Sequence, residues 1–398
     1  MEPMLVNGRR YALPARPVVV VCIDGCAPEY LEREPGALPF VDRARAAGTY
    51  ALVQGNMPSF TNPNNVSIVT GVRPDVHGVS GNHFLDAGGR QVPMTDPAHL
   101  RCPTLLTAFA DRGARVCCIT AKEKLRRLVG SGLTGVSISG EGAAAAAKKD
   151  DDVRALVRAA GEPPGIYSGR LSAHVLDLGL ALLDRAPPPD LLYLSLTDYV
   201  PHKHAPGTPG ADAFFAGLDR RLAALDARGV LLGVTADHGM NAKADANGAP
   251  NVVYLEPLLA GLSGTTVVLP ITDPYVAHHG ALGSFACVYL EDPADEDRAA
   301  ALLTGVAGVE AALPGARAAA ELNLPADRVG DLVVLGDRHT VLGRSPEHHD
   351  LSGLDRPLRS HGGLHERTVP LMINRPLPPE RLEGAGSHDL FHLLLGLT

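Results

Sequence analysis

The stretch Pro17-Val-Val-Val-Val-Cys-Ile-Asp24-Gly25 is a continuous run of apolar, mostly β-branched residues that ends in an acid and a glycine. Such a run is typical of a strand buried on both faces, as the strands of parallel sheets are. Ligands of open α/β sheets bind beyond the carboxyl ends of the strands. The stretch therefore predicts an α/β fold in which Asp24 reaches a binding site. The alternative is a simple turn role before Gly25.

Two later stretches repeat this pattern of an apolar strand that ends in an acid. Leu191-Leu-Tyr-Leu-Ser-Leu-Thr-Asp198 is followed by His202, and Gly229-Val-Leu-Leu-Gly-Val-Thr-Ala-Asp237 is joined directly to His238. An aspartate and a histidine four residues apart at a strand exit can bind one cation. Helical segments and a further strand at 116–120 lie between these stretches, a rhythm that predicts βαβ units.

A threonine stands in the stretch Met57-Pro-Ser-Phe-Thr61-Asn-Pro-Asn-Asn-Val-Ser-Ile-Val-Thr-Gly71. We expect a helix here with Asn62 as its N-cap and Pro63 as its first residue. The free backbone N–H groups of such a helix start favour anions, including a phosphate-like group. The Thr61 hydroxyl is a poor nucleophile until a base or a metal activates it. A capped helix without a catalytic role is therefore the local alternative.

Three further segments offer groups that could contact a ligand. Asn82 lies in a glycine-rich loop after this helix, and Lys122 and Lys124 follow the strand at 116–120. The alternatives are a turn asparagine and solvated lysines. Late in the chain, His361 precedes two glycines, which let a ligand or another backbone come close.

The sequence changes in character over residues 254–324, where no strand ends in acids and histidines of the earlier kind. We interpret 254–324 as a smaller inserted α+β cap, and 1–253 together with 325–398 as the metal-binding core. The apolar run at 331–335 is expected to resume the core sheet. Element boundaries are the least certain part of such an interpretation.

Composition excludes several classes of protein. The 398 residues include 36 basic and 44 acidic ones, a net charge of −8, which argues against a general nucleic-acid binder and leaves a small cationic pocket open. No apolar run reaches the ~20 residues of a membrane span, and the first residues lack a signal pattern, so we expect a cytoplasmic protein. The six cysteines show no paired spacing and are interpreted as reduced core thiols. The oligomeric state is not fixed by the sequence, and a homodimer stays open.

The groups at the strand ends form a set of carboxylates and imidazoles with one hydroxyl: Asp24, Thr61, Asp198, His202, Asp237, His238 and His361. These donors suit Zn²⁺, with Mn²⁺ or Fe²⁺ as alternatives, and contain too much nitrogen for a Mg²⁺ or Ca²⁺ site. Seven groups are too many for one zinc ion and suit two. A metal pair can activate a nucleophile at one ion and stabilise a leaving group at the other.

The order of these motifs resembles the alkaline phosphatase superfamily, in the branch of the nucleotide pyrophosphatase/phosphodiesterases. The resemblance covers nearly the whole chain and rests on five motifs: Asp24, Thr61-Asn-Pro-Asn-Asn, Asp198-x-x-x-His202, Asp237-His-Gly-Met and His361-Gly-Gly. Within that superfamily, three stretches look most like the phosphonoacetate hydrolases: Ser59-Phe-Thr-Asn-Pro-Asn-Asn, Gly81-Asn-His-Phe and Thr120-Ala-Lys-Glu-Lys. The implied fold is an alkaline phosphatase-like three-layer sandwich with a mostly parallel central sheet.

The resemblance also implies a division of the metal ligands between two zinc ions. One zinc would be bound by Asp24, Thr61, Asp237 and His238, and the other by Asp198, His202 and His361.

The resemblance implies roles in the reaction as well. Thr61 would be the nucleophile that attacks phosphorus. Asn82 would hold a phosphonyl oxygen, while Lys122 and Lys124 would bind the charged groups of the substrate, notably its carboxylate. The implied reaction is hydrolysis of the carbon–phosphorus bond of phosphonoacetate to acetate and phosphate. A structural role is left to Arg126 and Arg127.

Three alternatives stay open from the sequence. A phosphodiesterase or nucleotide pyrophosphatase would use the same metals but usually offers an aromatic slot for a base, whereas this chain has few aromatic residues. A phosphomutase would isomerise its substrate without releasing phosphate. A non-catalytic zinc- or phosphonate-binding protein would leave a complete nucleophile and ligand set idle. Four histidines have no assigned role: His204, His278, His279 and His365.

Overall fold

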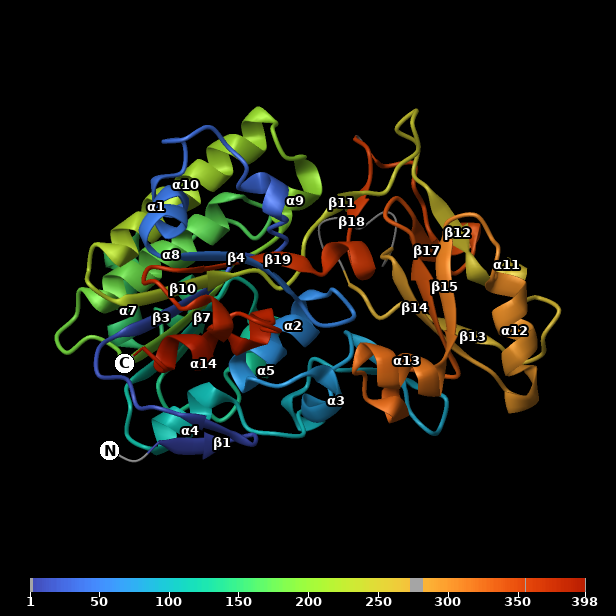
Figure 1. Ribbon diagram of the computed structural model, residues 1–398, viewed down its shortest axis with the longest axis horizontal. Coiled ribbons are helices and arrows are strands. Elements are labelled where there is room, and N and C mark those ends of the chain that lie inside the picture. Colours follow the sequence, from blue (N-terminus) through green and yellow to red (C-terminus); the bar gives the residue numbers. More distant parts are fainter. Residues whose placement is uncertain (1–2, 273–281, 355, 398) are drawn as a thin grey trace.

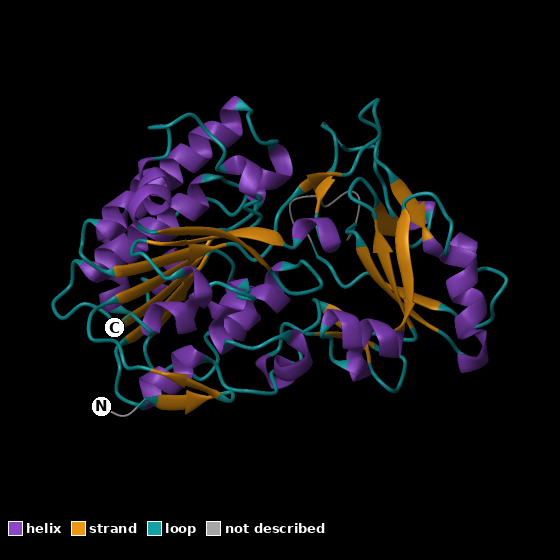
Figure 2. Cartoon of the chain, viewed as in Figure 1, coloured by secondary structure: helices purple, strands orange, loops and turns teal. Residues whose placement is uncertain are grey.

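The computed structural model describes residues 3–272, 282–354 and 356–397. Its largest sheet and its second-largest sheet lie side by side, one mostly parallel and flanked by many helices, the other antiparallel (Figures 1 and 2). The larger sheet has seven strands, in the order β4 (Thr49–Gln54), β19 (Thr368–Ile373), β10 (Leu231–Thr235), β3 (Val18–Cys22), β9 (Leu191–Ser195), β7 (Val116–Thr120) and β8 (Val136–Ser139).

The strands from β10 to β8 are parallel to one another. At the other edge, β19 runs antiparallel to both β10 and β4, so β4 has the direction of the parallel strands. Every residue of β3, β7, β9 and β10 is buried, as the apolar runs predict for strands covered on both faces. This arrangement confirms the predicted α/β class with a mostly parallel central sheet.

Helices cover both faces of this sheet and make the molecule three layers deep (Figure 2). One face carries helices that pack on each other and on the strands: α1 (Pro39–Ala47), α7 (Asp151–Ala160), α8 (Arg170–Leu183) and α10 (Pro209–Asp226). The other face carries α2 (Thr61–Thr70), α4 (Leu105–Asp111), α5 (Glu123–Val129) and α14 (Leu390–Leu395).

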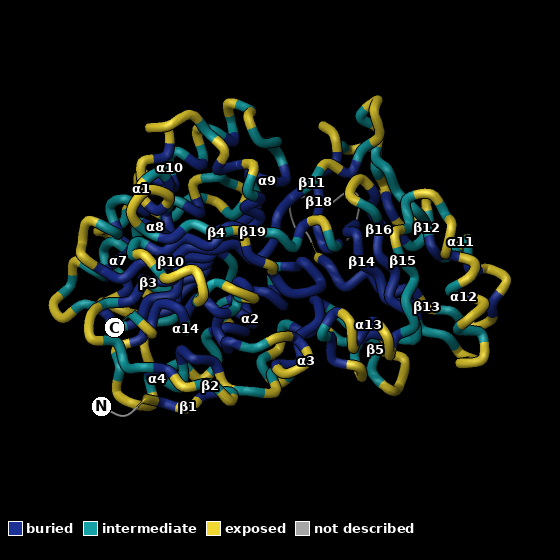
Figure 3. The backbone as a smooth tube through the Cα atoms, in the orientation of Figure 1, coloured by how far each residue is buried: buried dark blue, intermediate teal, exposed yellow. Residues whose placement is uncertain are grey.

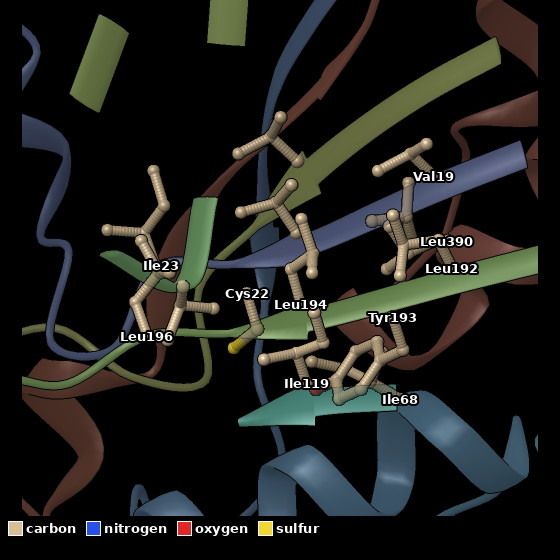
Figure 4. Close-up of a cluster of buried hydrophobic side chains, with 14 of the residues drawn as sticks. Val19, Cys22, Ile23, Ile68, Ile119, Leu192, Tyr193, Leu194, Leu196 and Leu390 are labelled. Carbon is tan, nitrogen blue, oxygen red and sulfur yellow. The ribbon is translucent and has the colours of Figure 1, made fainter. Parts of the chain in front are cut away.

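The buried core follows the central strands (Figure 3). In Figure 4, Val19 of β3 and Leu192 of β9 lie beside Leu390 of α14, and Ile68 of α2 lies next to Tyr193. Burying one aliphatic side chain of this size stabilises a fold by about 1.5–3 kcal/mol. The strands are therefore fixed along their length, and polar side chains are confined to their ends.

The second sheet is antiparallel, in the order β13 (Thr266–Val268), β14 (Phe285–Tyr289), β16 (Leu332–Gly336) and β15 (Val309–Pro314). It has its own hydrophobic cluster, which also takes in Met57 and Phe60 from the loop before α2. The expectation that the run at 331–335 resumes the core sheet is wrong, because β16 pairs with β14 and β15. An apolar run predicts a buried strand but carries no information about which sheet it joins. The limits 254–324 of an inserted cap stay a prediction.

The start of α2 also differs from the prediction. The helix begins at Thr61 with Phe60 as N-cap, so Asn62 is not the cap and Pro63 is the third helical residue. The first N–H groups of a helix have no partner within it, so proline is tolerated throughout the first turn and does not define the first residue. The Asn62 side chain instead donates a hydrogen bond to Asn82 Oδ1.

Two expectations from composition concern the whole chain. Among the described residues, no helix is long and apolar enough to cross a membrane. The six cysteines form no disulfide among the described residues, and five of them are buried as predicted, whereas Cys102 is only partly buried.

Candidate metal centre and nucleophile

Three acidic residues meet at the carboxyl edge of the central sheet. Asp24, Asp198 and Asp237 follow β3, β9 and β10 closely in sequence, and these strands are neighbours in parallel register. Parallel strands bring their carboxyl ends to the same edge, so residues far apart in sequence become adjacent. All three carboxylates are buried.

The first cluster consists of Asp24, Asp237 and His238, each of which offers a ligand atom within 4.8 Å of the others. His238 Nε2 lies 3.2 Å from Asp24 Oδ1. Asp24 Oδ2 is buried and makes no hydrogen bond within the described part of the chain. A buried carboxylate oxygen without a hydrogen-bond donor is costly, and a cation bound here would remove that cost.

The second cluster consists of Asp198, His202 and His361, again with ligand atoms within 4.8 Å of one another. Asp198 caps the short helix α9 (Tyr199–Lys203), which places His202 one turn further on. His202 Nε2 lies 3.0 Å from Asp198 Oδ2, and His361 Nε2 lies 4.0 Å from the same oxygen. The four-residue spacing therefore places its carboxylate and imidazole together, as the sequence predicts.

The three histidines share one orientation. Their Nδ1 atoms lie 2.7–2.9 Å from backbone carbonyl oxygens: His202 with Arg359, His238 with Gly239 and His361 with Ser59. A carbonyl oxygen only accepts, so each Nδ1 carries a proton and donates it, and with a metal bound at Nε2 the ring would be neutral. The Nε2 lone pairs then face the carboxylates, which is how metal-binding histidines are oriented.

The electrostatics of the first cluster also favour a cation. Burial and the charge of Asp24 raise the pKa of Asp237 to about 8. For His238, burial opposes the charged form, but the carboxylates of Asp237 and Asp24 outweigh it and raise the pKa to about 9. Carboxylates this close to each other tolerate full ionisation only with added positive charge. The donor set and this charge balance both fit a divalent metal of the zinc type.

Thr61 stands at the first residue of α2, beside the first cluster. Its Oγ1 lies 3.5 Å from Asp24 Oδ1 and 3.4 Å from His238 Nε2. The side chain is half-buried, so a substrate can reach it. The structure thus brings all seven sequence-predicted groups into two adjacent clusters with one hydroxyl beside the first.

The predicted substrate-binding groups lie around this centre at different depths. Lys122 Nζ lies 3.1 Å from Asp198 Oδ1 and 3.9 Å from Asp24 Oδ2. Its charge, with that of His202, outweighs the effect of burial and holds the pKa of Asp198 well below its usual range. Asn82 accepts from Asn62 and donates to Thr272.

Lys124 is further out than Lys122, on the exposed side of α5. After burial, its charge is the second cause of the lowered pKa of His83, the residue next to Asn82. Arg126 and Arg127 both pair with Glu123 on the same helix, which agrees with the structural role left to them.

Among the described residues, His204 and His365 take no place in the two clusters. His204 accepts a hydrogen bond from Tyr30 through its backbone oxygen, and His365 Nε2 lies 2.9 Å from Glu310 Oε2. His278 and His279 lie outside the described residues.

Two buried polar residues that sequence reasoning missed hold the ligand segments. Arg359 donates to the backbone oxygens of Pro201 and Met240, which belong to the segments of His202 and His238. Asn65 donates to Asp237 Oδ2. Asn65 could have been suspected, since it is an amide one helical turn after Thr61. Arg359 has no comparable signal.

Comparison with known proteins places this centre in a family. A model of the type I phosphodiesterase / nucleotide pyrophosphatase family matches residues 18–364. Phosphonoacetate hydrolase from Sinorhizobium meliloti, solved with phosphonoformate and with phosphonoacetate, is 44% identical with a TM-score of 0.93, over 100% of this chain and 99% of that chain.

More distant proteins share the fold or a short segment. Murine ectonucleotide pyrophosphatase / phosphodiesterase 5 is 17% identical with a TM-score of 0.65, over 96% of this chain and 95% of that chain. Ectonucleotide pyrophosphatase/phosphodiesterase family member 1 of Mus musculus is 38% identical over 71 residues, which are 18% of this chain and only 8% of the mouse protein. The chain is an enzyme of the type I phosphodiesterase / nucleotide pyrophosphatase family, within the alkaline phosphatase superfamily, and is similar along its whole length to phosphonoacetate hydrolase.

Proposed function

We propose that this enzyme hydrolyses the carbon–phosphorus bond of phosphonoacetate to acetate and phosphate, with two zinc ions and Thr61 as nucleophile. The observation that carries the proposal is the position of the Thr61 hydroxyl beside the first of two buried carboxylate–imidazole clusters. The similarity to a phosphonoacetate hydrolase over the whole chain supports the choice of substrate.

The proposed zinc ligands are Asp24, Thr61, Asp237 and His238 at one ion and Asp198, His202 and His361 at the other. Bound zinc would supply the positive charge that lowers the pKa of a hydroxyl and neutralises the phosphonate oxygens. The chain itself fixes the histidine tautomers through the three backbone carbonyls described above.

Thr61 Oγ1 would lose its proton to solvent, where it neutralises the hydroxide left by protonation of the carbon, and would form the bond to phosphorus while the carbon–phosphorus bond breaks. The electron pair of that bond moves to the methylene carbon and into the adjacent carboxylate, and the carbon takes up a proton from water. Water then cleaves the phospho-threonine, which returns the Thr61 hydroxyl and releases phosphate. The carboxylate stabilises the carbon leaving group, because it delocalises the negative charge that develops on the methylene carbon.

Cations near the carboxylate stabilise that charge. Lys122 is suited to this task since its ammonium group already lies between Asp198 and Asp24 at the centre. Lys124, two residues further on in the first turn of α5, would attract the carboxylate from the exposed side. Asn82 would donate to a phosphonyl oxygen in place of its present acceptor, Thr272.

We further propose residues 254–324 as a cap over this centre. Thr272 belongs to that segment and accepts a hydrogen bond from Asn82. Phe60, directly before the nucleophile, packs edge-on against Phe285 of the second sheet. These contacts support a cap that closes one side of the substrate site.

A second candidate activity follows from the matching family model, which describes phosphodiesterases and nucleotide pyrophosphatases. The same centre could cleave a nucleotide diester. Zinc-loaded protein should therefore be incubated separately with phosphonoacetate and with a nitrophenyl nucleotide ester, while phosphate, acetate and nitrophenol are measured.

We expect equal amounts of phosphate and acetate from phosphonoacetate, and loss of this release when a chelator is added. Much faster release of nitrophenol from the nucleotide ester would favour the second activity. A turnover unaffected by the chelator would contradict the metal assignment.

A further inference from the structure

Asn65 connects the nucleophile helix to a carboxylate of the first cluster. It lies one turn after Thr61 on α2 and is fully buried. Its Nδ2 donates to the backbone oxygen of Thr61 and to Asp237 Oδ2, both at 2.9 Å. One amide group thus holds the residue that carries the hydroxyl and the carboxylate beside it.

The orientation of this amide is fixed from the other side. Asn65 Oδ1 accepts from Tyr193 Oη at 2.6 Å and from Ser195 Oγ at 2.7 Å. Both donors are on β9, and the Tyr193 ring lies in the core next to α2 (Figure 4). All four hydrogen-bonding positions of the amide are used. A flipped amide would turn its oxygen toward the carbonyl of Thr61 and toward Asp237.

The carboxylate of Asp237 is held at both oxygens as a result. Its Oδ1 accepts from the backbone N–H groups of Gly25 and His238, at 3.2 and 3.0 Å. Its Oδ2 accepts from Asn65. Rotation of this side chain would therefore break bonds at either end, and among the described residues only Asn65 donates to it from a side chain.

We propose that Asn65 is a positioning residue that sets the distance between Thr61 and the first metal cluster. It acts through Asp237 and through the backbone of Thr61, and it touches no reacting atom. The proposal rests on the proposed function for the role of Thr61. The effect of Asn65 on metal binding at Asp24, Asp237 and His238 does not depend on which substrate the enzyme cleaves.

The neighbouring residue Asn64 provides a matched control. It is also fully buried on α2, but its side chain bonds only to the backbone of the preceding loop. Nδ2 donates to the oxygens of Asn56, Pro58 and Phe60, and Oδ1 accepts from the Asn56 N–H. Its replacement disturbs the same helix without touching either cluster.

The test compares Asn65→Asp with Asn64→Asp. Asn65→Asp replaces the amide NH₂ group by an oxygen. That oxygen faces the backbone oxygen of Thr61 and Asp237 Oδ2, so two hydrogen bonds become repulsive contacts. Zinc affinity of each site is measured by competition with a chromophoric chelator. The kcat and KM for phosphonoacetate are measured at saturating zinc, and thermal unfolding is followed for both variants.

For Asn65→Asp we expect about tenfold to hundredfold weaker zinc binding at one site only, which is the usual effect of losing a group that orients a metal ligand. At saturating zinc, kcat should fall about a hundredfold while KM changes less than about threefold, because positioning acts on the transition state. For Asn64→Asp we expect lost thermal stability, with kcat at saturating zinc within about threefold of wild type.

Wild-type zinc affinity at both sites and an unchanged kcat in Asn65→Asp would overturn the proposal, and so would equal kcat losses in the two variants. If Asn65→Asp does not fold, the double variant Tyr193→Phe, Ser195→Ala removes the orienting donors and keeps the amide. It should lower zinc affinity at one site by at least about threefold, and an unchanged affinity would again overturn the proposal.

The zinc measurement also separates this proposal from the proposed function. If wild-type protein binds zinc but does not cleave phosphonoacetate, the substrate is wrong while the Asn65 comparison still decides the positioning role, with kcat measured on the nitrophenyl nucleotide ester.

Discussion

The imidazole rings of His238 and His361 are stacked, with centroids 3.7 Å apart and planes 6° apart. His238 belongs to one ligand cluster and His361 to the other, so the two clusters are in direct contact through these stacked rings. Burial, followed by the charges of His238 and His202, holds the pKa of His361 well below its usual range. A neutral ring with its Nδ1 held by the Ser59 carbonyl presents its Nε2 lone pair to a metal.

Replacing His361 by alanine should reduce bound zinc from two ions to one per chain. The Asp24, Asp237 and His238 cluster keeps its three side chains, whereas the other cluster loses one of its three. Elemental analysis after dialysis against a weak chelator measures the number of zinc ions bound per chain. Two ions retained, or none, would contradict the division into two sites.

Thr61→Ala should lower phosphate release at least about a thousandfold while both zinc ions are retained, because a covalent route through this hydroxyl is lost. The three side chains of each cluster remain in place. Thr61→Ser keeps a hydroxyl and should keep measurable turnover. A wild-type rate in Thr61→Ala would show that another group is the nucleophile.

Lys122→Met and Lys124→Met should differ in their effects. Lys122 lies 3.1 Å from Asp198 Oδ1, so its loss should lower kcat and raise KM, together by about tenfold to hundredfold in kcat/KM. Lys124 is exposed, so its loss should act mainly on KM. Arg127→Met, on the same helix, is the control. Equal kinetic constants for all three variants and wild type would exclude both lysines from the site.

Arg359→Gln should weaken both stability and metal binding. The buried guanidinium holds the segments of His202 and His238 through the oxygens of Pro201 and Met240, and each hydrogen bond of a charged group contributes about 1.5–3 kcal/mol. We expect a lower free energy of unfolding and at least about tenfold weaker zinc binding. Arg221→Gln, which removes an ion pair with Asp177 elsewhere, should change stability alone. Unchanged zinc affinity in Arg359→Gln would contradict the expectation.

Because of His77, the free energy of unfolding should decrease as the pH falls. Burial, and then the charge of His388, lower its pKa to about 3, and its Nδ1 accepts from the Val79 N–H, so the native ring is neutral. The unfolded ring titrates near 6.5, so below that pH the unfolded state binds more protons. The stabilising contribution is complete above about pH 6.5 and is lost between about pH 6.5 and about pH 3.

Chemical denaturation of wild type and His77→Asn measures this effect. From about pH 6.5 to about pH 5 the wild-type free energy of unfolding should fall by about 2 kcal/mol more than that of the variant. The zinc contribution changes equally in both, since His77 is not in either cluster. Parallel pH profiles would mean that His77 is protonated in the native state.

Local sequence patterns were sufficient for the four central strands β3, β7, β9 and β10 and for the groups at the ends of three of them. The runs before Asp24, Asp198 and Asp237 are mostly apolar, as strands of a parallel sheet covered on both faces are. Local patterns did not predict which strands pair with each other when the partner strand is distant in the sequence. The strand Leu332–Gly336 reads like a core strand but pairs within the second sheet, and Pro63 fits any position in the first turn of a helix.

By itself, the sequence determined the α/β class, the order of the ligand-bearing motifs and the chemical type of the centre. Each of these depends on residues close together in the chain: an apolar run, the acid that ends it, and a histidine one turn later. Tertiary structure alone decided how the seven groups divide into two clusters, which nitrogen of each imidazole faces the carboxylates, and how Arg359 and Asn65 hold them. Those relations join segments up to hundreds of residues apart, such as His361 and Ser59, and they exist only once the sheet has brought its strand ends together.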